Sequence, residues 1–89
     1  MVTIRIPGLW RSIVGAAAIE VEAGSVAAAL RALVVQCPAL NAQLFDAQGQ
    51  LNPGLHLFVN QEAIRFRGGL AAALNDGDEI YIVPMLSGG

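Results

Sequence analysis

One amphipathic helix between two turn signals constrains the fold of this chain more than any other feature. Ser25 can cap its first turn, because a serine hydroxyl accepts hydrogen bonds from amides that lack helical partners. Pro38 ends it, because proline excludes helical geometry at the preceding residue. The sequence therefore predicts a helix over residues 26–37. The apolar stripe along this helix consists of Val26, Leu30, Leu33, Val34 and Cys37.

Segments with the two-residue alternation of β-strands flank this helix on both sides. The predicted strands cover residues 2–6, 19–22, 55–59, 63–67 and 79–83. In the first hairpin, Arg5 and the carboxylates of Glu20 and Glu22 are expected on one solvent face, where opposite charges would pair across the strands. In the fourth strand, Ile64 and Phe66 are expected to face the core. A short helical or irregular piece is expected around residues 40–45, and one helical turn at 69–74.

The order of these segments predicts an α+β fold in which one helix covers one face of a mixed sheet. We expect the first and last strands to pair in parallel at the centre of that sheet. The 89 residues leave room for one domain only. We predict that residues 1–83 form this domain and that residues 84–89 form a flexible tail ending in Gly-Gly.

Composition excludes several classes of function. The 89 residues carry a formal net charge of −2 with five arginines and no lysine, so there is no basic stripe for binding nucleic acid. No apolar run is long enough to span a membrane, so we expect a cytoplasmic protein that is a monomer when free. Cys37 and His56 are too few to form a zinc site, and Cys37 is assigned to core packing. We therefore expect neither a metal nor a bound cofactor.

The end of the chain carries the clearest chemical signal. Proline cannot donate to a strand ladder, so regular pairing is expected to stop at Pro84. Six extended residues reach roughly 20 Å at about 3.3 Å each. Gly88 and Gly89 have no side chains and would therefore fit a channel too narrow for a Cβ atom. A carboxylate on such a tether is a usable chemical handle.

Several short motifs identify a family that this chain resembles over nearly its full length. The motifs are Phe58–Val59–Asn60, Ile64–Arg65–Phe66, Gly68–Gly69–Leu70, Asp76–Gly77–Asp78–Glu79 and Ile82–Val83–Pro84, leading to Gly88–Gly89. In these motifs the chain is similar to the ubiquitin-like sulfur-carrier proteins of the β-grasp fold, the MoaD/ThiS family, which include the small subunit of molybdopterin synthase and the thiamine-pathway carrier. The spacing looks most like the carriers that serve cysteine-synthase-type enzymes, although Met85–Leu86–Ser87 replaces the more usual Ala-Val-Ala.

The resemblance implies a sulfur carrier that is a co-substrate of partner enzymes and not itself an enzyme. An E1-like enzyme would use ATP to adenylate the carboxylate of Gly89, and sulfide or a persulfide would displace AMP to give a thiocarboxylate. Gly88 would allow threading into the partner. The implied acceptor is a pyridoxal-phosphate cysteine-synthase-like enzyme that makes cysteine or a sulfur-containing metabolite. Alternatives are the molybdopterin synthase small subunit, a ubiquitin-like modifier and a non-covalent interaction module.

Strand alternation also predicts where a partner would dock. If Ile80 and Ile82 face the helix, Tyr81 and Val83 lie on the opposite face, beside Phe58 of the neighbouring strand. Apolar patches of this kind mark interaction sites, although scattered surface residues are the alternative. Trp10 and Leu9 either cap the core or join this surface. The predicted partner-binding residues are Phe58, Tyr81, Val83, Pro84, Met85, Leu86 and Ser87.

Overall fold

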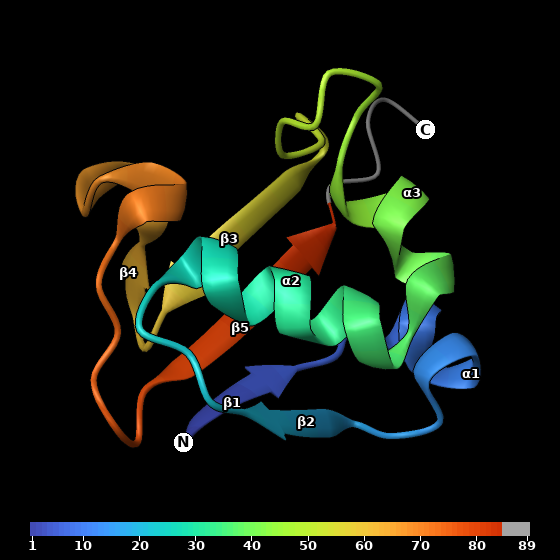
Figure 1. Cartoon of the computed structure of the whole chain (residues 1–89), viewed down its shortest axis with the longest axis horizontal. Coiled ribbons are helices and arrows are strands. Elements are labelled where there is room, and N and C mark those ends of the chain that lie inside the picture. Colours follow the sequence, from blue (N-terminus) through green and yellow to red (C-terminus); the bar gives the residue numbers. More distant parts are fainter. Residues whose placement is uncertain (85–89) are drawn as a thin grey trace.

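A five-stranded mixed sheet forms the centre of the computed structural model, which describes residues 1–84 (Figure 1). The strand order is β2-β1-β5-β3-β4, with β1 and β5 parallel and the other neighbours antiparallel. The two terminal strands therefore lie side by side at the centre, as predicted. The strands are β1 (Val2–Arg5), β2 (Ala18–Val21), β3 (Leu55–Val59), β4 (Glu62–Ala63) and β5 (Glu79–Pro84).

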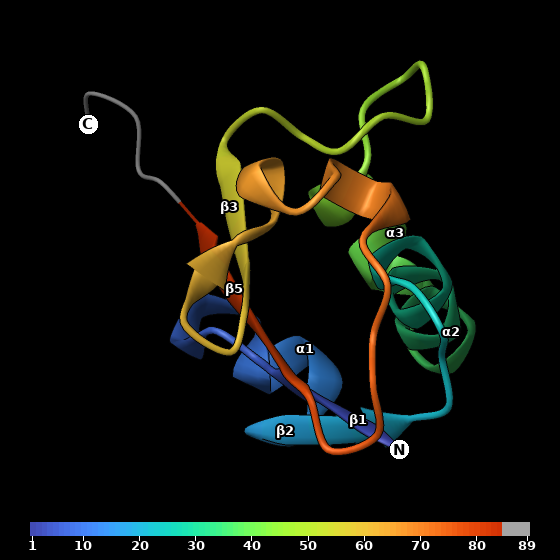
Figure 2. The ribbon, with the colours of Figure 1, turned by 90° about the vertical axis from the view of Figure 1, so that its left-hand side faces the viewer.

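Helix α2 (Val26–Gln36) crosses one face of this sheet, and Figure 2 shows it to one side of β3 and β5. The Oγ of Ser25 accepts a hydrogen bond from the amide of Ala28 at 3.2 Å, which confirms the predicted N-cap. The helix ends one residue earlier than predicted, with Cys37 at its C-cap. Cys37 is partly buried against the core, as expected.

The core lies between α2 and the facing side chains of the central strands. Ile4, Ile80, Val59 and Leu33 are fully buried there, because alternation along each strand directs every second side chain toward the helix. Trp10 is 5% exposed and belongs to this core, whereas Leu9 is 62% exposed. Of the two alternatives left open by the sequence, Trp10 therefore packs in the core, and Leu9 does not.

Several local predictions were wrong. The predicted strand 63–67 overlaps β4 only at Ala63, because the chain then enters a 3-10 turn over Ile64–Phe66. Ile64 is buried as predicted, but Phe66 points outward and is 70% exposed. Helix α1 (Arg11–Val14), which follows a 3-10 turn at Gly8–Trp10, was not predicted. Helix α3 (Asn41–Leu44) lies within the piece expected at 40–45.

The expected charge pairing in the first hairpin also differs. Arg5 lies opposite Ala18 in the β1–β2 register, and Glu20 lies opposite Thr3. The guanidinium of Arg5 instead pairs with Glu79 of the parallel strand β5, with 3.1 Å between Nε and Oε1. In the strand order, β5 lies on the side of β1 opposite to β2, and the carboxylate of Glu79 there comes within ion-pair distance of Arg5.

Candidate functional site

The sheet face turned away from α2 brings together three residues predicted to bind a partner. In the β3–β5 register, Phe58 lies opposite Tyr81 and His56 lies opposite Val83. Tyr81 and Val83 are 38% and 40% exposed, and Phe58 and His56 are half-buried. We call Phe58, Tyr81 and Val83 the outer-face cluster. It is an exposed apolar surface on the two strands nearest the end of the described chain.

Two shallow hollows flank Tyr81 and Val83, one on each side. The β3-side hollow has a volume of about 500 Å³, and its rim is lined by Phe58, Asn60, Gln61 and Glu79. The β1-side hollow has a volume of about 350 Å³, and it is lined on the opposite wall by Arg5, Ile6, Pro7 and Arg11. Tyr81 and Val83 thus form a ridge between two walls. The wall of the β3-side hollow carries two side-chain amides and a carboxylate, and the wall of the β1-side hollow carries two guanidinium groups.

A polar network fixes the orientation of Tyr81. Its hydroxyl donates to Oε1 of Glu79 at 2.7 Å, and the same oxygen accepts from Nε of Arg5 at 3.1 Å. The hydrogen bond from Tyr81, followed by that from Arg5, lowers the pKa of the Glu79 carboxyl. The hydrogen bond to Glu79 raises the pKa of Tyr81. Glu79 is therefore ionised and accepts from two residues of the outer face, which holds the aromatic ring of Tyr81 in place.

Asn60 ties the β3–β4 turn to the start of β5. Its φ of 57° lies in the left-handed region, which asparagine tolerates better than most residues. Oδ1 of Asn60 accepts from the amide of Glu79 at 3.1 Å, and Nδ2 donates to Oδ1 of Asp78 at 3.2 Å. The amide of Asn75, then Asn60, donates to the Asp78 carboxylate and lowers its pKa. These contacts fix one wall of the β3-side hollow.

The remaining predicted site residues belong to the tail. Pro84 is the last residue of β5, is partly buried and lies opposite Leu55, so strand pairing reaches one residue beyond the predicted end at 83. The other five lie outside the described residues. They are Met85, Leu86, Ser87, Gly88 and Gly89.

Sequence reasoning missed Arg5, Arg11 and Asn60 as parts of this surface. Asn60 carried a signal, because an asparagine directly after a strand is typical of a left-handed turn position. Arg5 was noted but assigned to the wrong partner strand. Arg11 had no signal, since its place beside Val83 depends on the direction that the chain takes after Pro7.

Residues 1–84 contain no group of three or more histidine, cysteine, aspartate or glutamate side chains placed to hold a metal ion. Within the same residues, no helix is long and apolar enough to cross a membrane.

Comparison with known proteins places this surface in context. The sequence matches the ThiS family over residues 4–89. It is 32% identical to the sulfur carrier protein CysO of Mycobacterium tuberculosis over 91 aligned positions, covering 99% of this chain and 98% of that protein. In the crystal structure of the Amycolatopsis orientalis BexX/CysO complex, one chain matches with a TM-score of 0.90 and 30% identity over 100% of both chains.

A third likeness is to the small archaeal modifier protein 1 of Methanosarcina acetivorans. The TM-score is 0.87 at 29% identity, over 99% of this chain and 95% of that one. Together these likenesses confirm the β-grasp fold and the family resemblance that the motifs predicted.

Proposed function

This chain belongs to the ThiS family, and on that premise we propose that it is a sulfur carrier whose C-terminal Gly89 becomes a thiocarboxylate. The observation that carries the proposal is the likeness to CysO in sequence and in fold. The sequence match to the ThiS family runs through Gly89. In this role the protein is a co-substrate. The ATP site and the catalytic groups belong to its partners.

The chemistry follows from the weakness of a carboxylate as an acyl donor. An E1-like activating enzyme joins the Gly89 carboxylate to the α-phosphorus of ATP, and pyrophosphate leaves. The sulfur of sulfide or of a persulfide then attacks the carbonyl carbon, and AMP leaves with the electrons of the broken C–O bond. After a persulfide attack, a thiol must reduce the resulting acyl disulfide. The product carries a soft nucleophilic sulfur on the end of the tail.

We propose a cysteine-synthase-like pyridoxal-phosphate enzyme as the sulfur acceptor. The likeness to the sulfur carrier CysO supports this choice. The likeness to the chain seen in the BexX/CysO complex supports a carrier that binds a partner protein. The product would be cysteine or a related sulfur-containing metabolite. The spacing of Arg65–Phe66 and Gly68–Gly69 is the sequence feature that agrees with this assignment.

The outer-face cluster is the proposed docking surface for the activating enzyme. It lies on β3 and β5, and β5 leads directly into the tail. Burying its exposed aromatic and aliphatic atoms against a partner would stabilise the complex, since removal of apolar area from water drives association. Pro84, Met85, Leu86 and Ser87 are then proposed to bind along the path into the partner's active site.

Intact-mass measurement tests the proposal. With the cognate activating enzyme, ATP and a sulfur source, the protein should gain about 16 Da, because sulfur replaces one oxygen. A variant lacking Gly88 and Gly89 should gain nothing. An unchanged mass of the wild-type protein would refute the carrier role.

Charge placed in the outer-face cluster tests docking. Phe58→Asp and Val83→Asp should each abolish adenylation while the protein stays folded. The matched control is Val35→Asp on α2, where the side chain is 80% exposed on the opposite side of the sheet. Normal adenylation of both cluster variants would remove this surface from the proposal.

A protein modifier is the second candidate, because the likeness to small archaeal modifier protein 1 also covers nearly the whole chain. In that role the Gly89 carbonyl would form an isopeptide bond with a lysine of another protein. The two roles differ in their products. Conjugates that persist on a reducing denaturing gel support the modifier, and a transferable thiocarboxylate supports the carrier.

A further inference from the structure

Arg11 occupies a fixed position on the wall of the β1-side hollow. It is the first residue of α1, and its Nε donates to the carbonyl oxygen of Ile6 at 3.1 Å. This hydrogen bond holds the guanidinium beside the chain that leaves β1. Tyr81 and Val83 of the outer-face cluster line the same hollow. Any protein that covers the cluster on this side therefore also approaches Arg11.

The charges around the hollow leave Arg11 without an acidic partner. Arg5, the other cation on this wall, already pairs with Glu79. Within residues 1–84 the remaining ion pairs join Met1 to Asp76 and Arg67 to Glu62, and none includes Arg11. Arg5 on this wall is thus neutralised within the protein, whereas no ion pair of residues 1–84 neutralises the guanidinium of Arg11.

This imbalance constrains what can dock here. Covering a cation with protein removes water from it, and the cost is large unless a negative group replaces that water. A guanidinium presents a planar fork of donors that matches a carboxylate. The walls of the hollow are apolar at Pro7 and Val83, which suits the methylene groups of a protein side chain.

We infer that Arg11 binds a carboxylate side chain on the activating enzyme, as the specificity contact at one edge of the docking surface. The inference rests on the proposed function, because the partner is the enzyme that adenylates Gly89. The apolar cluster supplies contact area, and the Arg11 pair fixes orientation and selects an enzyme with an acidic residue at the matching place. Arg11 lies on the carrier surface and takes no part in the chemistry of adenylation.

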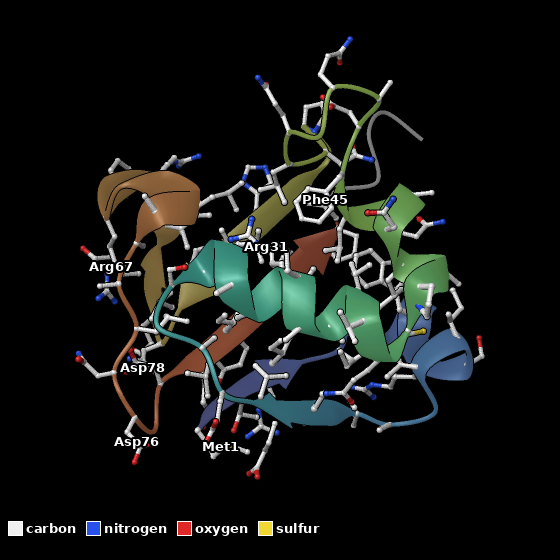
Figure 3. All side chains as sticks on the ribbon, in the orientation of Figure 1. Met1, Arg31, Phe45, Arg67, Asp76 and Asp78 are labelled. Carbon is white, nitrogen blue, oxygen red and sulfur yellow. The ribbon has the colours of Figure 1, made fainter. Side chains whose placement is uncertain are left out.

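Steady-state adenylation kinetics with the cognate enzyme test this inference. We compare wild-type protein, Arg11→Gln and Arg11→Glu at low and at high salt. The matched control is Arg31→Glu, which makes the same charge change at an exposed position of α2, on the other side of the sheet (Figure 3). Arg11→Lys keeps the charge without the planar fork. Thermal unfolding of each variant verifies folding, and Arg11→Gln can still donate to Ile6 if Arg11→Glu does not fold.

The Arg11→Gln change should raise the KM for the carrier about 10-fold to 100-fold, the effect of losing one charged hydrogen-bonded partner, with kcat unchanged. Arg11→Glu should raise this KM further, and Arg11→Lys should raise it less than Arg11→Gln does. Arg31→Glu should alter the KM less than about 2-fold. High salt should weaken wild-type binding more than Arg11→Gln binding. If the Arg11 variants behave like Arg31→Glu, the inference about Arg11 is wrong and the proposed function stands. If the wild-type protein is never adenylated, the proposed function itself is wrong.

Discussion

Replacement of Asn60 tests how firmly the β3–β4 turn is held against β5. The side chain makes two hydrogen bonds, to the amide of Glu79 and to the carboxylate of Asp78, at 3.1 and 3.2 Å. The backbone has a φ of 57°, a conformation that alanine adopts only under strain and glycine adopts freely. Asn60→Ala removes both hydrogen bonds and adds this strain. Asn60→Gly removes the hydrogen bonds alone.

The expected loss of stability follows from these two contributions. Two partly solvated hydrogen bonds contribute about 1 kcal/mol together, taking the lower part of the usual range. The left-handed conformation costs alanine about 1 kcal/mol more than glycine. We therefore expect the free energy of unfolding to fall by about 2 kcal/mol for Asn60→Ala and about 1 kcal/mol for Asn60→Gly. For a domain of this size each kcal/mol lowers Tm by about 4–8 °C.

Urea unfolding, followed by the fluorescence of the buried Trp10, measures both changes. A double-mutant cycle with Asp78→Ala isolates the Asn60–Asp78 contact, because the coupling energy survives only where both partners are present. Asn60→Ala and Asn60→Gly proteins of equal stability would show that the backbone conformation costs nothing. Wild-type stability in Asn60→Gly would show that the two hydrogen bonds contribute nothing.

Three further predictions follow from the fold. Leu33→Ala, at a fully buried position of α2, should lower the free energy of unfolding by about 2–5 kcal/mol, whereas Val35→Ala on the exposed side should change it by less than about 0.5 kcal/mol in the same urea titration. Ser25→Ala removes the N-cap and should cost about 1 kcal/mol, seen as a lower Tm by circular dichroism; an unchanged Tm would contradict the cap. The pKa of Glu79 is lowered from 4.5 in the folded protein, so its contribution to stability is present above that pH and is lost as the pH falls through the folded pKa. The urea midpoint should therefore drop in acid, and Glu79→Gln should reduce the drop; an equal drop in both proteins would refute this.

The sequence predicted those parts of the fold that depend on short-range patterns. Helical periodicity over residues 26–36 predicted α2 to within one residue of its end. Two-residue alternation over residues 55–59 predicted β3 with its observed bounds. The parallel pairing of β1 with β5 was expected because these two segments alternate most regularly, and it is confirmed. Among the site residues, alternation alone put Tyr81 and Val83 on the exposed face.

Predictions failed where two structures share one pattern or where distant segments meet. Ile64 and Phe66 follow the two-residue alternation of a strand. The structure has a 3-10 turn over these residues instead, and Phe66 points into solvent. The pairing of Arg5 with Glu79 joins residues 74 positions apart, so no local pattern could reveal it. Arg11 reaches the outer face only because the chain turns back after Pro7, which was not predicted.

The parallel alignment of β1 and β5 offers a practical route to immobilisation. The register pairs Thr3 with Glu79, so Met1 lies beside the start of β5, near Asp76, and Pro84 lies at the opposite end of the strand (Figure 3). In a protein made of these 89 residues, which contain no lysine, an amine-reactive surface would couple to the amino group of Met1 and hold every molecule in the same orientation, with Pro84 turned toward the solution. The contact with Asp76 raises the pKa of that amine.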